Sequence, residues 1–503
     1  MLRARKIAGF LGVTGAAYAY DKYECYSVAE RSLRAIGTGV YLTYQYKVVW
    51  TPENASEVNG RVARRLVDTC KRNEGLYVKF GQALASMAFA LPREYIEPLG
   101  ELHDKAMTFP LEEVKKIINA EVGDIALTDF EDAPVASASL AQVHKAKLNG
   151  KMVAVKIQKP NVAVQAEWDL RMYHILLTVL ELFFDLPLDW TYEYTKAQLL
   201  GEVDFRSEAE HSNRAAKEFQ QSPSLRDCIY VPVIYACSKR VIISEWIENA
   251  MKVTDKEQIV AAGLDSHQVV SDAVSAFAYQ IFHVGHVHCD PHPGNLLVRC
   301  KPGGRAGQHE VVVIDHGLYV ELPEELRLDY ANFWVAMAPP MNTAALQATC
   351  TKWGIQDFEL YAKITAFNKQ GERSAEDMVM QEASKKTKTE LQALMKERIK
   401  RALNDTSLFP RPLLFVGRCQ NYIRATNWAH GNPIDRFAVM MQYANTALAV
   451  NNAEPQTVWQ QMRSAYVSTA MYLARSFMWL LPAPGPDADA APSAADGGPA
   501  AQV

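Results

Sequence analysis

The sequence predicts an α+β fold with a small lobe that contains strands and a larger lobe that is mostly helical. Residues 141–147 and 152–158 are rich in apolar and β-branched residues and flank Asn149-Gly150, which is typical of a β-hairpin with a tight turn. Beyond Asp265, the apolar residues recur mainly with the helical period. Strands followed by a run of helices favour one α+β lobe and one helical lobe.

Helical periodicity is also found in the N-terminal half, at residues 57–87, 111–122, 162–184 and 192–219. The first of these helices is interrupted at Asn73-Glu74-Gly75, and the second is followed by Gly123, a common helix terminator. Further strands are expected in two places, as a pair within 230–247 and as a short hairpin of 296–298 with 311–314.

Composition excludes several classes of protein. The chain has 503 residues, of which 49% are apolar and 22% charged, so we expect a globular protein and not a disordered one. The net charge of −4 is too balanced for a dedicated nucleic-acid binder, and we expect no nucleic-acid partner. The eight cysteines form no C-x-x-C pair, so neither a disulfide scaffold nor a cysteine-based zinc site is expected.

These patterns divide the chain into five parts. Residues 1–50 form a targeting or membrane-proximal segment and residues 51–125 a helical extension. Residues 126–250 form a small lobe with inserted helices, residues 251–481 a helical lobe and residues 482–503 a disordered tail. The tail is rich in Ala, Pro, Gly and Asp and has no periodicity. An apolar helix over 465–481 precedes it and could face either the core or a membrane.

The N-terminus begins with basic residues and continues as an acid-free apolar run over residues 7–20. This pattern suits an organelle presequence or a short membrane anchor, because fourteen residues are fewer than the ~20 that cross a bilayer as a helix. A helix packed on its own protein is the alternative, and targeting is slightly preferred. The uncharged, aromatic residues 36–46 could lie at a lipid interface or be buried, and burial is the simpler expectation.

Three residues with oxygen-bearing side chains are expected to meet at the mouth of a cleft. Asp290 and Asn295 lie in one loop that Pro291 and Pro293 stiffen, and Asp315 follows an apolar strand. Such side chains can hold Mg²⁺ beside the phosphates of a nucleotide. The Asp-x4-Asn spacing followed by Asp-x-Gly is typical of the catalytic and metal-binding loops of protein kinases.

Other residues occur along the chain in the order that a protein kinase requires. Lys156 lies on the second hairpin strand, where it would grip the nucleotide phosphates, and Glu208 lies on a later helix as its natural partner. Glu245 and Ile247 end the small lobe, where a backbone hinge would receive adenine. A loop without glycine takes the place of the usual glycine-rich loop, with residues Ala136, Ser137, Ala138 and Ser139. We therefore predict a protein-kinase-like bilobal fold.

A metal hydrolase is the rival interpretation. Its zinc or iron site would use the histidines around Cys289 and Asp290, which are His283, His286, His288 and His292. Two of them close an apolar helix, where cations favour the helix dipole. Structural histidines are therefore the preferred interpretation.

Four motifs together resemble the UbiB-type atypical kinases, which are also called aarF-domain-containing kinases. They are Lys79-Phe-Gly-Gln82, Ala141-Gln-Val-His144, Glu202-x-Asp204 ahead of Glu208, and His288-Cys-Asp-Pro-His-Pro-Gly-Asn295. The resemblance runs from about residue 57 to residue 338. The N-terminal region and Asp315-His-Gly-Leu-Tyr319 are most similar to a mitochondrial branch of this family.

The resemblance implies a family-specific gate in the N-terminal extension. In such proteins the Lys-x-Gly-Gln helix packs over the nucleotide site and blocks a protein substrate, so Lys79 and Gln82 would be gate residues. Glu202 and Asp204 would pair with Lys79 or help to hold the metal and nucleotide.

The resemblance also implies the catalytic set and the cofactors. Lys156 and Glu208 would be the phosphate-gripping ion pair, Asp290 would be the catalytic residue, and Asn295 and Asp315 would bind Mg²⁺. The cofactors would be ATP or ADP with Mg²⁺. Because Ser137 differs from the alanine that the family's loop often has, the preference between ATP and ADP stays open.

Two functions are compatible with these residues. The first is an Mg²⁺-dependent ATPase, or a kinase of a small molecule or lipid, and the resemblance implies that it would support lipid and coenzyme Q homeostasis at the mitochondrial inner membrane. Its expected partners are a nucleotide, membrane lipid or an isoprenoid quinone, and membrane-associated proteins. The second is a nucleotide-sensing scaffold or lipid-handling chaperone without phosphoryl transfer. The first is preferred because Lys156, Glu208, Asp290, Asn295 and Asp315 are all present.

Overall fold

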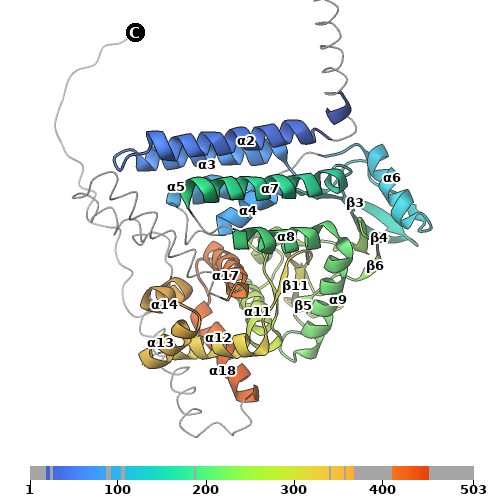
Figure 1. Ribbon diagram of the computed structural model, residues 1–503. Helices are drawn as coiled ribbons and strands as arrows, with labels where there is room; N and C mark the ends of the chain where they lie inside the picture. The colour runs from blue at the N-terminus through green and yellow to red at the C-terminus, as the bar shows by residue number, and fades with distance from the viewer. Residues whose placement is uncertain are drawn as a thin grey trace, which may run out of the picture.

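The computed structural model describes residues 19–22, 26–86, 92–103, 108–185, 189–338, 341–355, 358–367 and 410–451. Most of the expected targeting run, the helix expected over 465–481 and the expected tail lie outside these residues. The described chain forms a layer of long helices over a small lobe with a sheet and a larger, mainly helical lobe (Figure 1).

The small lobe is built on a six-stranded sheet in the order β1-β3-β4-β7-β6, with β2 beside β3. The predicted hairpin is confirmed, since β3 and β4 pair antiparallel and Asn149 and Gly150 both adopt positive φ in the turn between them. The predicted strand pair within 230–247 is confirmed as β6 and β7. The bounds are β1 Leu127–Thr128, β2 Ala136–Ser137, β3 Ala141–Leu148, β4 Lys151–Gln158, β6 Ile234–Cys237 and β7 Val241–Glu245.

Two helices sandwich this sheet. Helix α6 (Leu111–Val122) buries Val114 and Ile118 against one side of the sheet, in a core shared with Val153 and Val155 of β4. Helix α9 (Phe205–Gln221) packs on the small lobe through Phe205. The predicted bounds of α6 are confirmed, but the expected boundary at residue 125 is corrected, because α6 packs on the sheet and not on the extension.

The extension has its own hydrophobic core. It contains α2 (Val28–Tyr44), the π-helical turn η1 (Gln45–Val49), α3 (Ala55–Asn73), α4 (Leu76–Ser86), α5 (Arg93–Gly100) and the short η2 (Glu101–His103). Helix α7 (Val162–Phe184), which was expected in the small lobe, buries Val162, Ala166 and Leu170 in this same core. A buried ion pair between Arg31 and Asp169 joins α2 to α7. The extension is therefore a bundle completed by an element from the small lobe's sequence.

Gly81 permits the close packing of α4 within this bundle. A β-carbon at this position would lie 2.1 Å from Cδ1 of Leu102 and 3.2 Å from Sγ of Cys70. We expect Gly81→Ala to lower the free energy of unfolding by ~1–3 kcal/mol, because it overpacks a filled core. Urea unfolding of the two proteins measures the difference.

Gly60→Ala, in the middle of α3, is the matched control. Its β-carbon would come no closer than 3.7 Å to another atom, so the substitution should stabilise the helix by ~0.5–1 kcal/mol. Equal stabilities for Gly81→Ala and the unsubstituted chain would contradict the packing argument.

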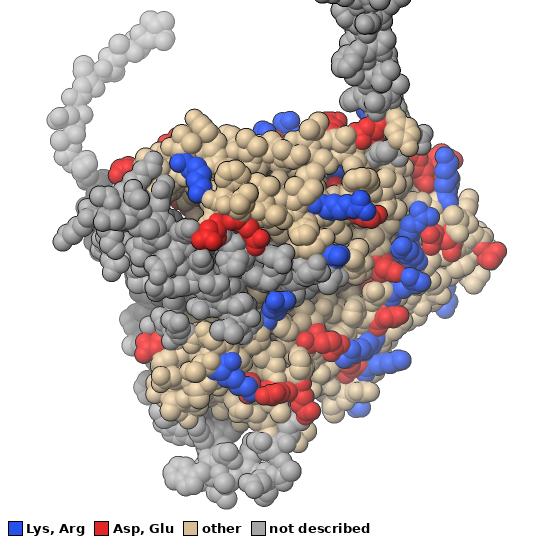
Figure 2. Space-filling view, viewed as in Figure 1, with Lys and Arg blue, Asp and Glu red and all other residues tan. Residues whose placement is uncertain are grey.

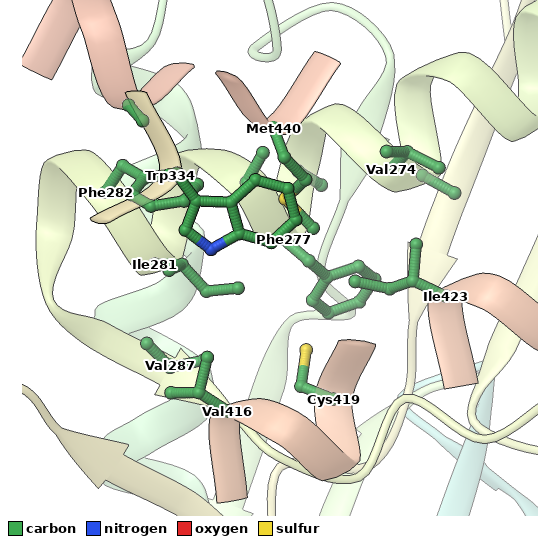
Figure 3. Packing of buried hydrophobic residues seen from close by; sticks show 14 of the residues in the cluster. Val274, Phe277, Ile281, Phe282, Val287, Trp334, Val416, Cys419, Ile423 and Met440 are labelled. Carbon is green, nitrogen blue, oxygen red and sulfur yellow. The ribbon is translucent and has the colours of Figure 1, made fainter. Parts of the chain in front are cut away.

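The larger lobe is organised around α11 (Ser266–Tyr279) and its π-helical continuation η3 (Gln280–Val284). Phe277, Phe282 and Trp334 meet in its core, and Val416 and Cys419 of a later helix close the cluster (Figure 3). The helices of this lobe are α10 Lys256–Ala261, α12 Glu324–Ala336, α13 Thr343–Lys352, α14 Phe358–Phe367, α17 Pro412–Ala429 and α18 Arg436–Asn451.

Two small sheets line the junction between the lobes. One has the order β5-β11-β10-β8, and the other pairs β9 with β12. The predicted hairpin of 296–298 with 311–314 is confirmed as β10 and β11. The bounds are β5 Ile229–Tyr230, β8 Met251–Lys252, β9 His286–His288, β10 Leu296–Cys300, β11 His309–Val313 and β12 Tyr319–Glu321.

The helix expected over 192–219 is corrected to two helices. Helix α8 (Asp189–Val203) ends before Asp204, which adopts an extended conformation and caps α9 by accepting a hydrogen bond from the backbone N–H of Arg206. Within the part of the chain that the structure describes, we find no helix with the length and apolar content of a transmembrane span.

Candidate active site

The ends of four strands bring the three predicted loop residues together. Asn295 immediately precedes β10 and Asp315 closely follows β11, and these strands pair with Leu296 opposite Val313. Asp290 follows β9, which pairs with the strand after Asp315. The Nδ2 of Asn295 donates to the carbonyl oxygen of Asp290 at 3.0 Å. The loop therefore has a fixed shape at one edge of both sheets.

Lys156 on β4 connects the two lobes at this point. Its Nζ donates to Oε1 of Glu208 at 2.6 Å and to Oδ2 of Asp315 at 3.2 Å. Glu208 lies in the first turn of α9, and its side chain is largely buried. The Asp315 side chain keeps 38% of its surface exposed, so it faces the opening between the lobes. The structure thus joins three of the predicted residues, from three different elements, in one ionic cluster.

The charges of this cluster shift one another's pKa values. Desolvation alone would lower the pKa of Lys156, but the negative charges of Asp315 and Glu208 outweigh it and raise this pKa. Desolvation opposes the ionisation of Asp315, yet Lys156 and the N–H of Gly317 hold its pKa well below the usual range. Desolvation raises the pKa of Glu208, which Lys156 offsets only in part. Lys156 and Asp315 are therefore both charged at neutral pH.

The predicted gate residues separate into two groups. Lys79 on α4 forms an ion pair with Glu202 on α8 at 2.5 Å, and the nearby charges of Glu202 and Asp290 keep its pKa raised despite desolvation. Because Lys79 also interacts with the charges of Asp290 and Asp315, the extension lies beside the loop of Asp290. Of the two roles expected for Asp204, pairing with Lys79 is not found, because the Asp204 carboxylate binds Nε and a terminal nitrogen of Arg206 at 2.9 and 2.6 Å, and a role in holding the metal or nucleotide stays a prediction. Gln82 donates to the backbone oxygen of Leu102 within the extension.

The loop that replaces the glycine-rich loop is a tight hydrogen-bonded hairpin. Ala136 and Ser137 pair with β3, and the N–H of Ala138 donates to the carbonyl oxygen of Ala141 at 2.8 Å. All four residues of this loop, including the buried Ser139, avoid positive φ. Alanine and serine therefore fit the backbone as it stands, and glycine is not needed.

The hinge residues are placed between the lobes, but the Glu245 side chain points to the larger one. Its carboxylate accepts a hydrogen bond from the hydroxyl of Tyr230 at 2.5 Å and lies 3.6 Å from NH1 of Arg299. The N–H of Glu245 is already used by the carbonyl oxygen of Val233. Ile247, two residues later, is half-buried. Glu245 therefore serves as a link between the lobes, and its own N–H is not free for a ligand.

Sequence reasoning missed Arg418, which binds the predicted catalytic residue. Its NH2 donates to Oδ1 of Asp290 at 2.8 Å, and both side chains are largely buried, with 9% and 13% of their surfaces exposed. Desolvation would raise the pKa of Asp290, but Arg418 and then Lys79 lower it below the usual range. Helix α17 carries several other polar residues, among them Arg424, so its sequence does not single out Arg418, and its partner lies 128 residues away.

The histidines do not form the rival metal site. Within the described ranges, no group of three or more His, Cys, Asp or Glu side chains is arranged to hold a metal ion. Each of the four histidines has another hydrogen-bond partner: Thr446 for His283, Glu218 for His286, the carbonyl oxygen of Leu318 for His288, and the N–H of Gly294 for His292. The structural interpretation of these histidines is therefore the one that fits the described geometry.

Comparison with known proteins finds a family model, relatives in sequence and a solved structure. A family model described as the ABC1 atypical kinase-like domain matches residues 101–350. The ABC1 family protein C10F6.14c of Schizosaccharomyces pombe is 33% identical over 466 residues, which cover 90% of this chain and 85% of that protein. AarF domain-containing protein kinase 1 of Mus musculus is 36% identical over 326 residues, which cover 61% of each chain. Among solved structures, the Rv3197–erythromycin complex from Mycobacterium tuberculosis is 24% identical, with a TM-score of 0.42, and the match covers 75% of this chain and 97% of that one.

Proposed function

This chain belongs to the ABC1 family of atypical kinases, which includes the AarF domain-containing kinases, and we propose that it binds ATP with Mg²⁺ and transfers the γ-phosphoryl group to water or to a small acceptor. Membership of this family confirms both the predicted resemblance and the protein-kinase-like α+β fold. The observation that carries the proposal is the cluster of Lys156, Glu208 and Asp315, in which a single ammonium group links the sheet, α9 and the metal-binding loop.

The residues at the site fit a magnesium nucleotide. Asp315 offers a partly exposed carboxylate, and Asn295 uses its Nδ2 on the loop, which leaves its amide oxygen for a ligand. Both are hard oxygen donors of the kind that Mg²⁺ prefers, and nucleotide phosphates would supply further oxygens. When bound, Mg²⁺ would neutralise charge on the phosphates.

The chain's own residues would carry the remaining tasks. Lys156 would donate hydrogen bonds to phosphate oxygens, and Glu208 would keep its ammonium group oriented and charged. Asp290 would orient the attacking hydroxyl and accept its proton, with Arg418 holding the carboxylate in place. Because Lys79 of the extension lies close enough to Asp290 for their charges to interact, the acceptor would be water or a small molecule and not a folded protein.

Substitution of Asp290 tests this function. We expect Asp290→Asn to lower ATP turnover about 10²–10⁴-fold, because the residue acts on the attacking hydroxyl, while nucleotide binding is kept. Lys156→Ala should weaken binding itself. Steady-state turnover and the nucleotide-dependent shift in melting temperature, both measured on the full chain, separate the two effects. Unchanged turnover in Asp290→Asn would contradict phosphoryl transfer and leave a nucleotide-sensing scaffold as the function.

We also propose that the protein works at the mitochondrial inner membrane, in lipid and coenzyme Q homeostasis. The basic N-terminus followed by the apolar residues 7–20 supports the location, and the similarity to a mitochondrial branch of the family supports the role. Import of the radiolabelled full chain into isolated mitochondria tests the location. A chain that stays accessible to protease outside the organelle would contradict it.

A further inference from the structure

The extension carries large apolar side chains on its outer surface. Of the 21 large apolar side chains that are exposed within the described residues, eleven lie on the neighbouring α2, η1 and α7. They are Leu33, Ile36, Val40, Tyr44 and Val48 on the first two elements, and Val164, Trp168, Ile175, Val179, Leu182 and Phe183 on the third. We call this set the α2/α7 face. Its concentration on two helices sets it apart from the single exposed apolar residues that any protein has.

The apolar residues of α2 point directly away from the protein. Arg31, Ala35 and Thr38 are buried, which defines the inner side of the helix. Leu33 and Val40 lie about half a turn away from these residues, on the outer side, and Leu33 is 69% exposed. The expectation that residues 36–46 are buried is thus wrong for the outer side of this helix. Helix α2 therefore carries more apolar side chains than it buries in the core of the extension.

Helix α7 repeats this arrangement. Ala166, Leu170 and Leu177 are buried, whereas Ile175 and Leu182 point outward, and Leu182 is 81% exposed. The two helices lie side by side at the top of the molecule (Figure 1) and are joined by the Arg31–Asp169 ion pair. In the space-filling view this upper region is mostly free of charge, with only isolated Lys, Arg, Asp and Glu (Figure 2).

The charges on the two helices largely cancel each other. Arg34 pairs with Glu30 on α2, and Arg171 pairs with Glu167 on α7, each at 2.5 Å between residues four apart. Lys47 lies beside Phe184, with its Nζ 5.0 Å from the ring centroid. The α2/α7 face is therefore an apolar surface with neutralised charges and aromatic rings, as found where helices lie in the interface of a bilayer.

From this geometry we infer that the α2/α7 face rests on a lipid bilayer, with α2 and α7 parallel to its surface. Because α2 and α7 have 17 and 23 residues, the α2/α7 face is about 25–35 Å long. The sequence that precedes α2 supports a lipid bilayer as the partner of this face. It has basic residues followed by the apolar residues 7–20, and the last of these lies eight residues before Val28, a distance of at most about 29 Å. A segment of that composition suits a lipid interface, so the face would be tethered next to the membrane. The inference rests on the proposed membrane location and adds the surface and orientation to it.

Flotation of the full chain with vesicles tests the inference. The vesicles contain phosphatidylcholine with one-third phosphatidylglycerol. Two variants address the two helices separately, Leu33→Glu with Val40→Glu on α2, and Ile175→Glu with Leu182→Glu on α7. Each pair should lower the partition coefficient by about tenfold or more, because a charged group must then enter the interface. The matched control is Val233→Glu with Val260→Glu, two exposed apolar residues outside the face, and it should bind vesicles like the unsubstituted chain.

Several outcomes would overturn the inference. One is unchanged flotation of both face variants, which would place membrane binding, if any, in the N-terminal segment alone. Another is a shift from dimer to monomer in size-exclusion chromatography with flotation intact, which would make the face a self-association surface. Melting temperatures equal to that of the unsubstituted chain show that the variants fold. Import and ATP turnover are measured separately. A chain that enters mitochondria and hydrolyses ATP but does not bind vesicles would contradict this inference and not the proposed function.

Discussion

Asp315→Asn should abolish the Mg²⁺-dependent response of this protein to nucleotide. The residue is the partly exposed carboxylate of the ionic cluster and is the strongest candidate for a metal ligand. A nucleotide at ~100 times its dissociation constant raises the free energy of unfolding by roughly 2.7 kcal/mol, which is a shift of a few degrees in a chain of this size. We expect this shift with Mg-ATP in the unsubstituted chain and its loss in the variant. Turnover should fall about 10³-fold or more, since metal ligation supplies several kcal/mol of charge stabilisation.

Asp129→Asn is the matched control for this substitution. Asp129 pairs with Lys147 at 2.7 Å on the surface of the small lobe, away from the loops of the site. Removing this exposed pair should change stability by less than about 1 kcal/mol and leave the nucleotide response intact. A full Mg²⁺-dependent shift in Asp315→Asn would show that the nucleotide binds without this carboxylate, and the assignment of the metal site would have to be abandoned.

Arg418→Leu should cost more stability than any surface substitution in the chain. It leaves the Asp290 carboxylate largely buried without its main cationic partner, and breaking such a pair costs ~3–5 kcal/mol. Because Arg418 holds Asp290 in place, turnover should be lost as well. Urea unfolding measures the first effect and ATP hydrolysis the second. Arg418→Lys keeps the charge but not the planar guanidinium, so it should restore most of the stability and only part of the turnover.

The pH dependence separates a charge effect from a packing effect at this position. Arg418 and Lys79 hold the folded-state pKa of Asp290 below its unfolded value, which is about 3.9. The stability that the ion pair provides is therefore present above about pH 4 and is lost as the pH falls through the folded-state pKa. The gap in stability between the unsubstituted chain and Arg418→Leu should shrink below pH 4. A gap that is independent of pH would mean that α17 stabilises the loop by packing alone. Arg72→Leu, which breaks the exposed pair of Arg72 with Asp68, is the control and should cost less than about 1 kcal/mol.

The sequence by itself determined the elements whose cause is local. Asn149-Gly150 fixed the hairpin because both residues accept positive φ, and the apolar periods fixed the bounds of α6 and α7. It also determined the order of Lys156, Glu208, Asp290, Asn295 and Asp315, and with it the family, since the chemistry of phosphate and metal binding requires these residue types at these spacings.

Only the tertiary structure decided which distant residues meet. Asp204 was expected either to pair with Lys79 or to help hold the metal and nucleotide, but its carboxylate lies at a helix N-terminus and binds the nearest donors, those of Arg206. Helix α7 joins the extension because its buried side completes that core, which no periodicity within α7 reveals. The pairing of Arg418 with Asp290 crosses 128 residues. Local hydrogen bonds and periodicity act over a few residues and can be read from the sequence, whereas the choice of a buried partner depends on how helices that are distant in the sequence pack into each hydrophobic core.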